Sequence, residues 1–93
     1  MIGSKDRIRI HFCDRLLERF SLDLTLEEYL ALYRKVVAQV YPPILTEPSG
    51  REWRNILYKN ESLYVLLERG AGLITVIDRM GMMSKLRVRN RKK

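Results

Sequence analysis

The sequence has very little cysteine and histidine. Cys13 is the only cysteine and His11 the only histidine among the 93 residues. One cysteine cannot form an intramolecular disulfide, and the two residues together cannot supply the four ligands of a structural zinc site. These absences exclude a disulfide-stapled secreted fold, so we expect the stability to come from packing alone.

Long apolar segments are missing as well. The longest apolar stretch covers residues 72–77, whereas a membrane-spanning helix needs about 18 apolar residues or more. Residues 1–15 lack the apolar core of a secretory signal. With 46% apolar and 31% charged residues, the composition predicts one soluble globular domain, which we expect in the cytoplasm and not at a membrane.

Acidic residues are absent from the end of the chain. Residues 1–78 hold eleven basic and all eleven acidic residues, so the net charge of +7 comes entirely from residues 79–93. Such a block attracts polyanions through counterion release, and nucleic acid is the commonest one in a cytoplasm. A solvated tail that aids solubility is the alternative. The seven basic residues of the block are Arg79, Lys85, Arg87, Arg89, Arg91, Lys92 and Lys93.

Two helices are predicted in the first half of the chain. The apolar residues of 11–20 fall on one arc at 100° per residue, which predicts a helix ending at Phe20. Two alternatives remain for its start: either Ser4 caps the helix, or residues 7–10 form a short strand before it. Thr25 and Glu28 match the capping box that begins a second helix. Its apolar stripe runs to Val40, and Pro42 with Pro43 ends it.

The second half of the chain is typical of an antiparallel sheet. After a surface loop over residues 42–51, three stretches rich in aromatic and β-branched residues predict strands. They cover residues 52–59, 62–69 and 73–79. Basic and aliphatic residues alternate over 85–89, which predicts a fourth strand after a turn at Gly81 and its neighbouring methionines.

Together these elements predict an α+β fold, with two N-terminal helices packed on one face of an antiparallel sheet of about four strands. Residues 1–83 are expected to form a single domain, and residues 84–93 a basic C-terminal strand or tail.

His11, Arg15 and Arg19 are spaced by four residues, so they form one stripe beside the apolar arc of the first helix. Ordinary surface ion pairs with Asp14 and Glu18 would explain this stripe. The alternative is phosphate chemistry, because arginine binds phosphate oxygens in a bidentate manner and histidine can move a proton near neutral pH. RNA carries its own nucleophile, the 2′-hydroxyl, so cleavage there needs no metal and no cofactor.

The segments HFCDRLLERF and LYVLLERGAGLITVIDR resemble a family of small bacterial and phage domains. That family is similar to the barnase–EndoU–colicin–RelE superfamily of metal-independent ribonucleases, which includes RNA-cleaving toxins. The resemblance covers residues 8–79, although Ile10 and Phe12 replace residues that are usually small. It implies catalytic roles for His11, Arg15, Arg19 and Thr75. It also implies that the substrate is RNA, in some cases RNA on the ribosome. A further implied partner is an acidic inhibitor protein.

The alternation of side chains in the predicted strand also bears on Thr75, independently of the resemblance. Alternation along residues 73–79 places it on one face with Leu73 and Ile77, so we expect it to point toward the helices. The preference of threonine for strands is the simpler explanation of its position.

Basic and aromatic residues are interleaved in the predicted strands, as in proteins that bind single-stranded RNA. Arg51, Arg54 and Lys59 surround Trp53 and Tyr58. Trp53 is more often a core residue in so small a protein. Tyr64 is expected on the face opposite Leu63, where it either stacks a base or covers the sheet. The candidate nucleic-acid-binding residues are Arg54, Lys59, Tyr64, Lys85, Arg87, Arg89 and Arg91.

The sequence therefore predicts an RNA-binding protein of the metal-independent endoribonuclease type. Two alternatives stay open. One is a nucleic-acid-binding regulator without catalysis, and the other is a protein-interaction module with a basic C-terminal tail.

Overall fold

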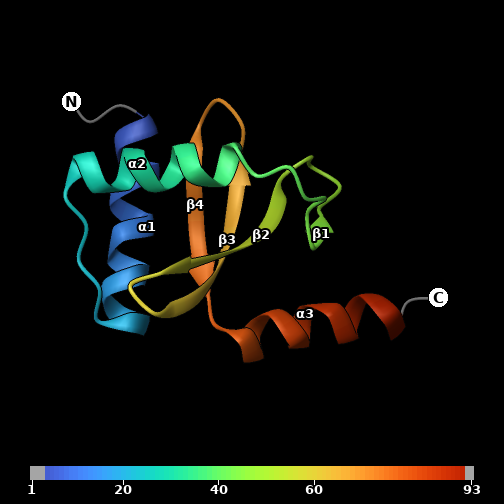
Figure 1. The fold of residues 1–93 in the computed structure, drawn as a ribbon. Helices are drawn as coiled ribbons and strands as arrows, with labels where there is room; N and C mark the ends of the chain where they lie inside the picture. Colours follow the sequence, from blue (N-terminus) through green and yellow to red (C-terminus); the bar gives the residue numbers. More distant parts are fainter. Residues whose placement is uncertain (1–3, 92–93) are drawn as a thin grey trace.

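The computed structural model describes the backbone of residues 4–91 and the side chains of residues 5–88. Four antiparallel strands form one sheet in the order β1-β2-β3-β4. Two helices precede the sheet and one follows it (Figure 1). In chain order the elements are α1 (Ser4–Phe20), α2 (Leu26–Val37), β1 (Leu45–Thr46), β2 (Glu52–Tyr58), β3 (Glu61–Glu68), β4 (Gly72–Ile77) and α3 (Arg79–Arg91).

The sheet has a hydrophobic cluster on each face. Along β3 the side chains alternate, so Leu63 and Val65 join the cluster under α1 and α2, whereas Tyr64 and Leu66 join the cluster with α3. This arrangement confirms the predicted α+β fold with both N-terminal helices on one face of the sheet. It also places α3 on the opposite face, a position that the sequence pattern does not predict.

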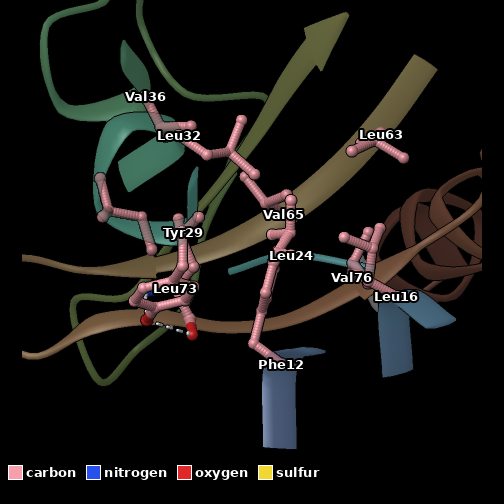
Figure 2. Packing of buried hydrophobic residues seen from close by; sticks show 11 residues of the cluster. Phe12, Leu16, Leu24, Tyr29, Leu32, Val36, Leu63, Val65, Leu73 and Val76 are labelled. Carbon is pink, nitrogen blue, oxygen red and sulfur yellow. Dashed lines mark hydrogen bonds between the residues drawn. The ribbon is translucent and has the colours of Figure 1, made fainter. Parts of the chain in front are cut away.

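The larger cluster lies between the two N-terminal helices and the sheet (Figure 2). Phe12 and Tyr29 meet edge to face in it, with ring centroids 5.7 Å apart. The Tyr29 hydroxyl donates to the carbonyl of Leu73 at 3.1 Å and accepts from its N–H at 2.9 Å. Burial raises the pKa of this hydroxyl, so it keeps its proton and can do both. The buried members are Phe12, Leu16, Leu24, Tyr29, Leu32, Val36, Leu63, Val65, Leu67, Leu73 and Val76.

The smaller cluster holds α3 against the other face of the sheet. Trp53, Leu66 and Met82 are buried in it, and Leu86 packs against them. Trp53 is 2% exposed, which confirms its interpretation as a core residue. Met82 and Leu86 are four residues apart, so they lie on one face of α3. None of the helices within residues 4–91 is both long and apolar enough to cross a membrane.

The prediction of a fourth strand over residues 85–89 is wrong, because these residues belong to α3. The prediction of a turn at the methionines is also wrong. A sequence signal for the helix was present at its start, where the carboxylate of Asp78 accepts from the N–H of Gly81 at 2.7 Å, as an N-cap residue does. The helix is also rich in methionine, lysine, leucine and arginine, which favour helices, and Val88 is its only β-branched residue.

The N-terminal helices match the expected bounds except at the end of α2. The end of α1 at Phe20 is confirmed, and the alternative of a strand over residues 7–10 is wrong because α1 begins at Ser4. The capping box of Thr25 and Glu28 is confirmed by both of its hydrogen bonds.

The second helix ends earlier than predicted, at Val37, and Val40 is 90% exposed. Just beyond the helix, the side chain of Gln39 donates to the carbonyl of Asn55 in β2 at 2.8 Å. This hydrogen bond holds the segment after α2 against the sheet. The predicted loop over residues 42–51 contains the short strand β1, which pairs with the start of β2.

Candidate nucleic-acid interface

The stripe predicted on α1 exists, but its three side chains have different environments. His11 is exposed. Arg15 donates from Nη1 to Oε1 of Glu18 at 3.2 Å, which is the surface ion pair proposed as the simpler explanation. Arg19 donates from Nη1 to the carbonyl of Val76 at 2.6 Å. One member of the stripe is therefore exposed to solvent without a described partner, and two are engaged by the protein.

The hydrogen bond of Arg19 stabilises the edge of the sheet. β4 is the outer strand on that side, and an outer strand has backbone groups without a strand partner. Arg19 satisfies the carbonyl of Val76, and the hydroxyl of Tyr29 satisfies both backbone groups of Leu73. This structural role explains an arginine at this position without any ligand.

Thr75 does not face the helices, so that prediction is wrong. Thr75 pairs with Leu66, whereas Leu67 pairs with Leu73, so Ile74 is an extra residue in β4. This β-bulge breaks the alternation. Thr75 therefore shares a face with Leu66, on the α3 side of the sheet. The structure keeps His11, Arg15 and Arg19 together on α1 and separates Thr75 from them by the thickness of the sheet.

Arg54 is buried and fully engaged, unlike the binding residue that the sequence suggested. Its side chain is 6% exposed. It donates from Nη1 to the carbonyl of Tyr41 at 2.8 Å, and from Nε and Nη2 to Glu52 at 2.8 and 2.7 Å. Arg54 and Glu52 are two residues apart in β2, so they share a face of the strand. That spacing of opposite charges is the signal that could have identified the pair.

Glu52 also accepts from Arg69, at 3.1 Å. This hydrogen bond, followed by the one from Arg54, lowers the pKa of the Glu52 carboxyl below its ordinary value. The carboxylate therefore stays ionised and holds both guanidinium groups, so neither Arg54 nor Arg69 is a ready ligand for phosphate.

Lys59 and Tyr64 lie on opposite sides of the sheet. Lys59 is exposed in the β2–β3 turn, 3.8 Å from the carboxylate of Glu28 in α2 and 5.4 Å from the centroid of the Tyr58 ring. Tyr64 is half-buried against the cluster under α3, which confirms its predicted face. The structure brings Tyr64, and not Lys59, to the side of the sheet on which α3 lies.

The described part of α3 carries basic side chains that form no ion pair with an acid. Six basic residues within residues 5–78 pair with carboxylates, at distances of 2.7–3.9 Å. By contrast, none of the basic side chains described for α3, namely Arg79, Lys85 and Arg87, makes an ion pair. All three are exposed. The backbone of Arg89 and Arg91 continues the helix, and their side chains lie outside the described residues.

A groove of about 990 Å³ separates α3 from the turn between β1 and β2. Figure 1 shows this turn and the second half of α3 at the same end of the molecule. Sequence reasoning missed the groove, because it depends on the helical conformation of α3. Its walls consist of Leu45, Glu47, Pro48, Ser49, Ser84, Lys85 and Val88.

No family model, curated protein or solved structure matches this chain. The resemblance to the ribonuclease superfamily therefore stays a prediction. Across the part of the chain that the structure describes, no three histidine, cysteine, aspartate or glutamate side chains cluster as metal ligands do. The geometry of the molecule is then the remaining guide to its function.

Proposed function

We propose that this protein binds RNA through α3. The observation that carries the proposal is the excess of positive charge on this one helix. The domain before it has equal numbers of basic and acidic residues, whereas the last fifteen residues have seven basic and no acidic ones. Docking of Met82 and Leu86 on the sheet fixes α3 to the domain, so the exposed side chains of Arg79, Lys85 and Arg87 belong to a defined surface. Such a surface attracts the RNA backbone by counterion release.

RNA cleavage has weaker support than RNA binding. The four residues that the resemblance names do not form one site, since Thr75 lies on the other face of the sheet. Arg15 is paired with Glu18, and Arg19 is bonded to a backbone carbonyl. A ribonuclease needs groups that converge on one phosphate. Catalysis therefore stays a prediction of the resemblance, and our proposal is limited to binding.

The proposal is tested by titrating labelled RNA with the protein at low and moderate salt. If about four basic side chains contact phosphates of a single strand, the slope of log affinity against log salt is about −3. The affinity then falls roughly 50-fold between 50 and 200 mM salt. DNA of the same sequence is the control for the 2′-hydroxyl. Absence of RNA binding at 50 mM salt would refute the proposal.

The same samples distinguish binding from cleavage. In the presence of EDTA we expect the RNA to be recovered intact from both the natural protein and the His11→Ala variant, with equal affinities, because His11 lies on α1. Electrophoresis of the recovered RNA is the measurement. Fragments produced by the natural protein and not by His11→Ala would instead assign a catalytic function to the α1 stripe.

A further inference from the structure

Trp53 organises the groove beside α3. Its indole Nε1–H donates to Oε2 of Glu47 at 3.0 Å, which satisfies a polar group of a side chain that is only 2% exposed. The ammonium group of Lys85 lies over the same indole, 5.1 Å from the ring centroid. A cation over an indole face is attracted to it. One buried side chain therefore positions both charged residues that line the groove.

Glu47 and Lys85 both keep hydrogen-bonding groups that a ligand in the groove can use. Within residues 5–88, Glu47 and Lys85 do not form an ion pair with each other. Oε2 of Glu47 receives the indole N–H, and a carboxylate has lone pairs on both oxygens for further donors. The ammonium of Lys85 has three N–H donors for an anion. A ligand that fits must carry N–H donors at one end and a negative charge at the other.

The walls between these charges are apolar. Leu45 and Pro48 line the groove from the β1 side, and Val88, which is 56% exposed, lines it from α3. A flat ring that is inserted between such walls would be removed from water on both faces. The volume of about 990 Å³ lies at the upper end of the usual range for small-molecule sites.

We propose that this groove seats one unpaired nucleotide of a bound RNA, with its phosphate at Lys85 and its base edge at Glu47. The inference rests on the proposed function, because α3 supplies both the groove wall and the charge that attracts the RNA. A nucleotide combines the three required features: an anion, an apolar ring and N–H groups on the ring edge. The base has to be unpaired, since the edge of a paired base is already bonded to its partner.

The carboxylate of Glu47 also predicts which base is favoured. Guanine has two adjacent N–H donors on its Watson–Crick edge, which suits the two oxygens of a carboxylate. Uracil has one N–H between two carbonyl oxygens, which a carboxylate repels. The groove therefore discriminates between these bases by at least about 5-fold, the lower end for a good two-bond contact.

Trp53 allows a direct measurement, because it is the only tryptophan in the chain. Five-nucleotide single-stranded RNAs are titrated into the protein while the Trp53 emission is recorded. The RNAs have a central guanine or a central uracil and are otherwise identical. We expect the guanine RNA to change the emission and to bind at least about 5-fold more tightly than the uracil RNA. When the guanine RNA is annealed to its complement, we expect it to lose its higher affinity over the uracil RNA.

Substitution of Glu47 tests the role of the carboxylate. In Glu47→Gln the amide oxygen can still accept from Trp53, so the fold is retained, but the amide nitrogen is a donor that opposes the guanine edge. The ratio of guanine to uracil affinity is expected to fall to about one. Glu61→Gln is the matched control, since Glu61 is an exposed acid at the start of β3 that does not line the groove. This control keeps the ratio of the natural protein.

Substitutions in α3 test the cation. Lys85→Met keeps the aliphatic stem over Trp53 and removes the charge, so it should abolish the emission change. Arg87→Met removes an equivalent exposed charge outside the groove and should weaken both RNAs equally, with their ratio unchanged.

The outcomes separate this inference from the proposed function. Salt-sensitive RNA binding with equal affinities for the two bases and an unchanged Trp53 emission overturns the nucleotide site and leaves RNA binding intact. Absence of any RNA binding overturns both. An emission change that depends on protein concentration and not on RNA would assign the groove to contact with a second copy of the chain and refute the nucleotide site.

Discussion

Replacing Arg87, Arg89 and Arg91 by glutamine is expected to weaken RNA binding on the order of 100-fold at 50 mM salt. The reason is that each lost phosphate contact reduces the number of counterions that RNA binding releases. For a single strand the salt slope becomes shallower by about 2, which is 0.7 for each contact. Glutamine favours helices about as well as arginine does, so α3 is expected to stay folded. Fluorescence anisotropy of labelled RNA over a salt series measures both quantities.

The control for this variant changes the same net charge elsewhere. Arg7→Gln, Arg34→Gln and Lys35→Gln together also remove three positive charges, from exposed positions on α1 and α2. If α3 is the binding surface, this control loses much less affinity than the α3 variant. Equal losses in both variants would mean that RNA responds only to the overall charge of the protein, and the location on α3 would be wrong.

Truncation of the chain is a poorer test of the same point. A chain that ends at Gly81 keeps only Arg79 of the basic block, but it also lacks Met82, which is 1% exposed in the cluster with Trp53 and Leu66. Removal of a buried methionine side chain costs about 2–5 kcal/mol. Loss of RNA binding in the truncated chain would therefore mix loss of charge with loss of packing.

Gly72→Ala is expected to destabilise the protein by about 2–5 kcal/mol, a large part of the about 5–15 kcal/mol of a typical domain. Gly72 has φ of +138°, which favours glycine, and a Cβ there would lie 2.5 Å from the hydroxyl oxygen of Tyr29. That hydroxyl cannot easily move, because it bonds both backbone groups of Leu73. Urea unfolding measures the loss as a lower midpoint with an unchanged slope.

Gly70→Ala separates the two causes. Gly70 also has a positive φ, +88°, but a Cβ there has no heavy atom within 4 Å. Only backbone strain then acts, so we expect a loss of about 1–2 kcal/mol. A loss at Gly72 no larger than the loss at Gly70 would contradict the close approach of Tyr29 to the edge of β4.

The N-terminal helices and the three longer strands were predictable because their sequence signals are local. The capping box at Thr25 and Glu28 fixes the start of α2 with hydrogen bonds that depend on four residues alone. The spacing of Phe12 and Leu16 marks the buried face of α1, and both are 0% exposed. In each case the local conformational preference agrees with the tertiary packing, and this agreement allows the element to be predicted from the sequence.

α3 was not predictable from alternation, because a short period-2 pattern also occurs by chance in a helix. Residues 85–89 alternate between basic and aliphatic side chains. The helix is nevertheless favoured, because the four-residue spacing of Met82 and Leu86 lets both side chains pack against Trp53. The N-cap at Asp78 was the better signal. The predicted strand over residues 73–79 includes Asp78, and this conceals its role as an N-cap residue.

The candidate site was less predictable than the fold, for two physical reasons. The face of Thr75 depends on the β-bulge at Ile74, and one extra residue reverses the face of every later side chain in the strand. The burial of Arg54 depends on two partners, Glu52 and the distant carbonyl of Tyr41. A carbonyl acceptor has no sequence signature, so this second contact appears only in the folded chain.

Mapping an RNA onto the isotopically labelled protein by NMR tests the central claim most directly. On addition of a short single-stranded RNA, we predict that the largest amide shifts fall in α3 and in the turn between β1 and β2, with the indole N–H of Trp53 among them. Shifts concentrated around His11, Arg15 and Arg19 on α1, with α3 unperturbed, would contradict the account and would favour the ribonuclease interpretation.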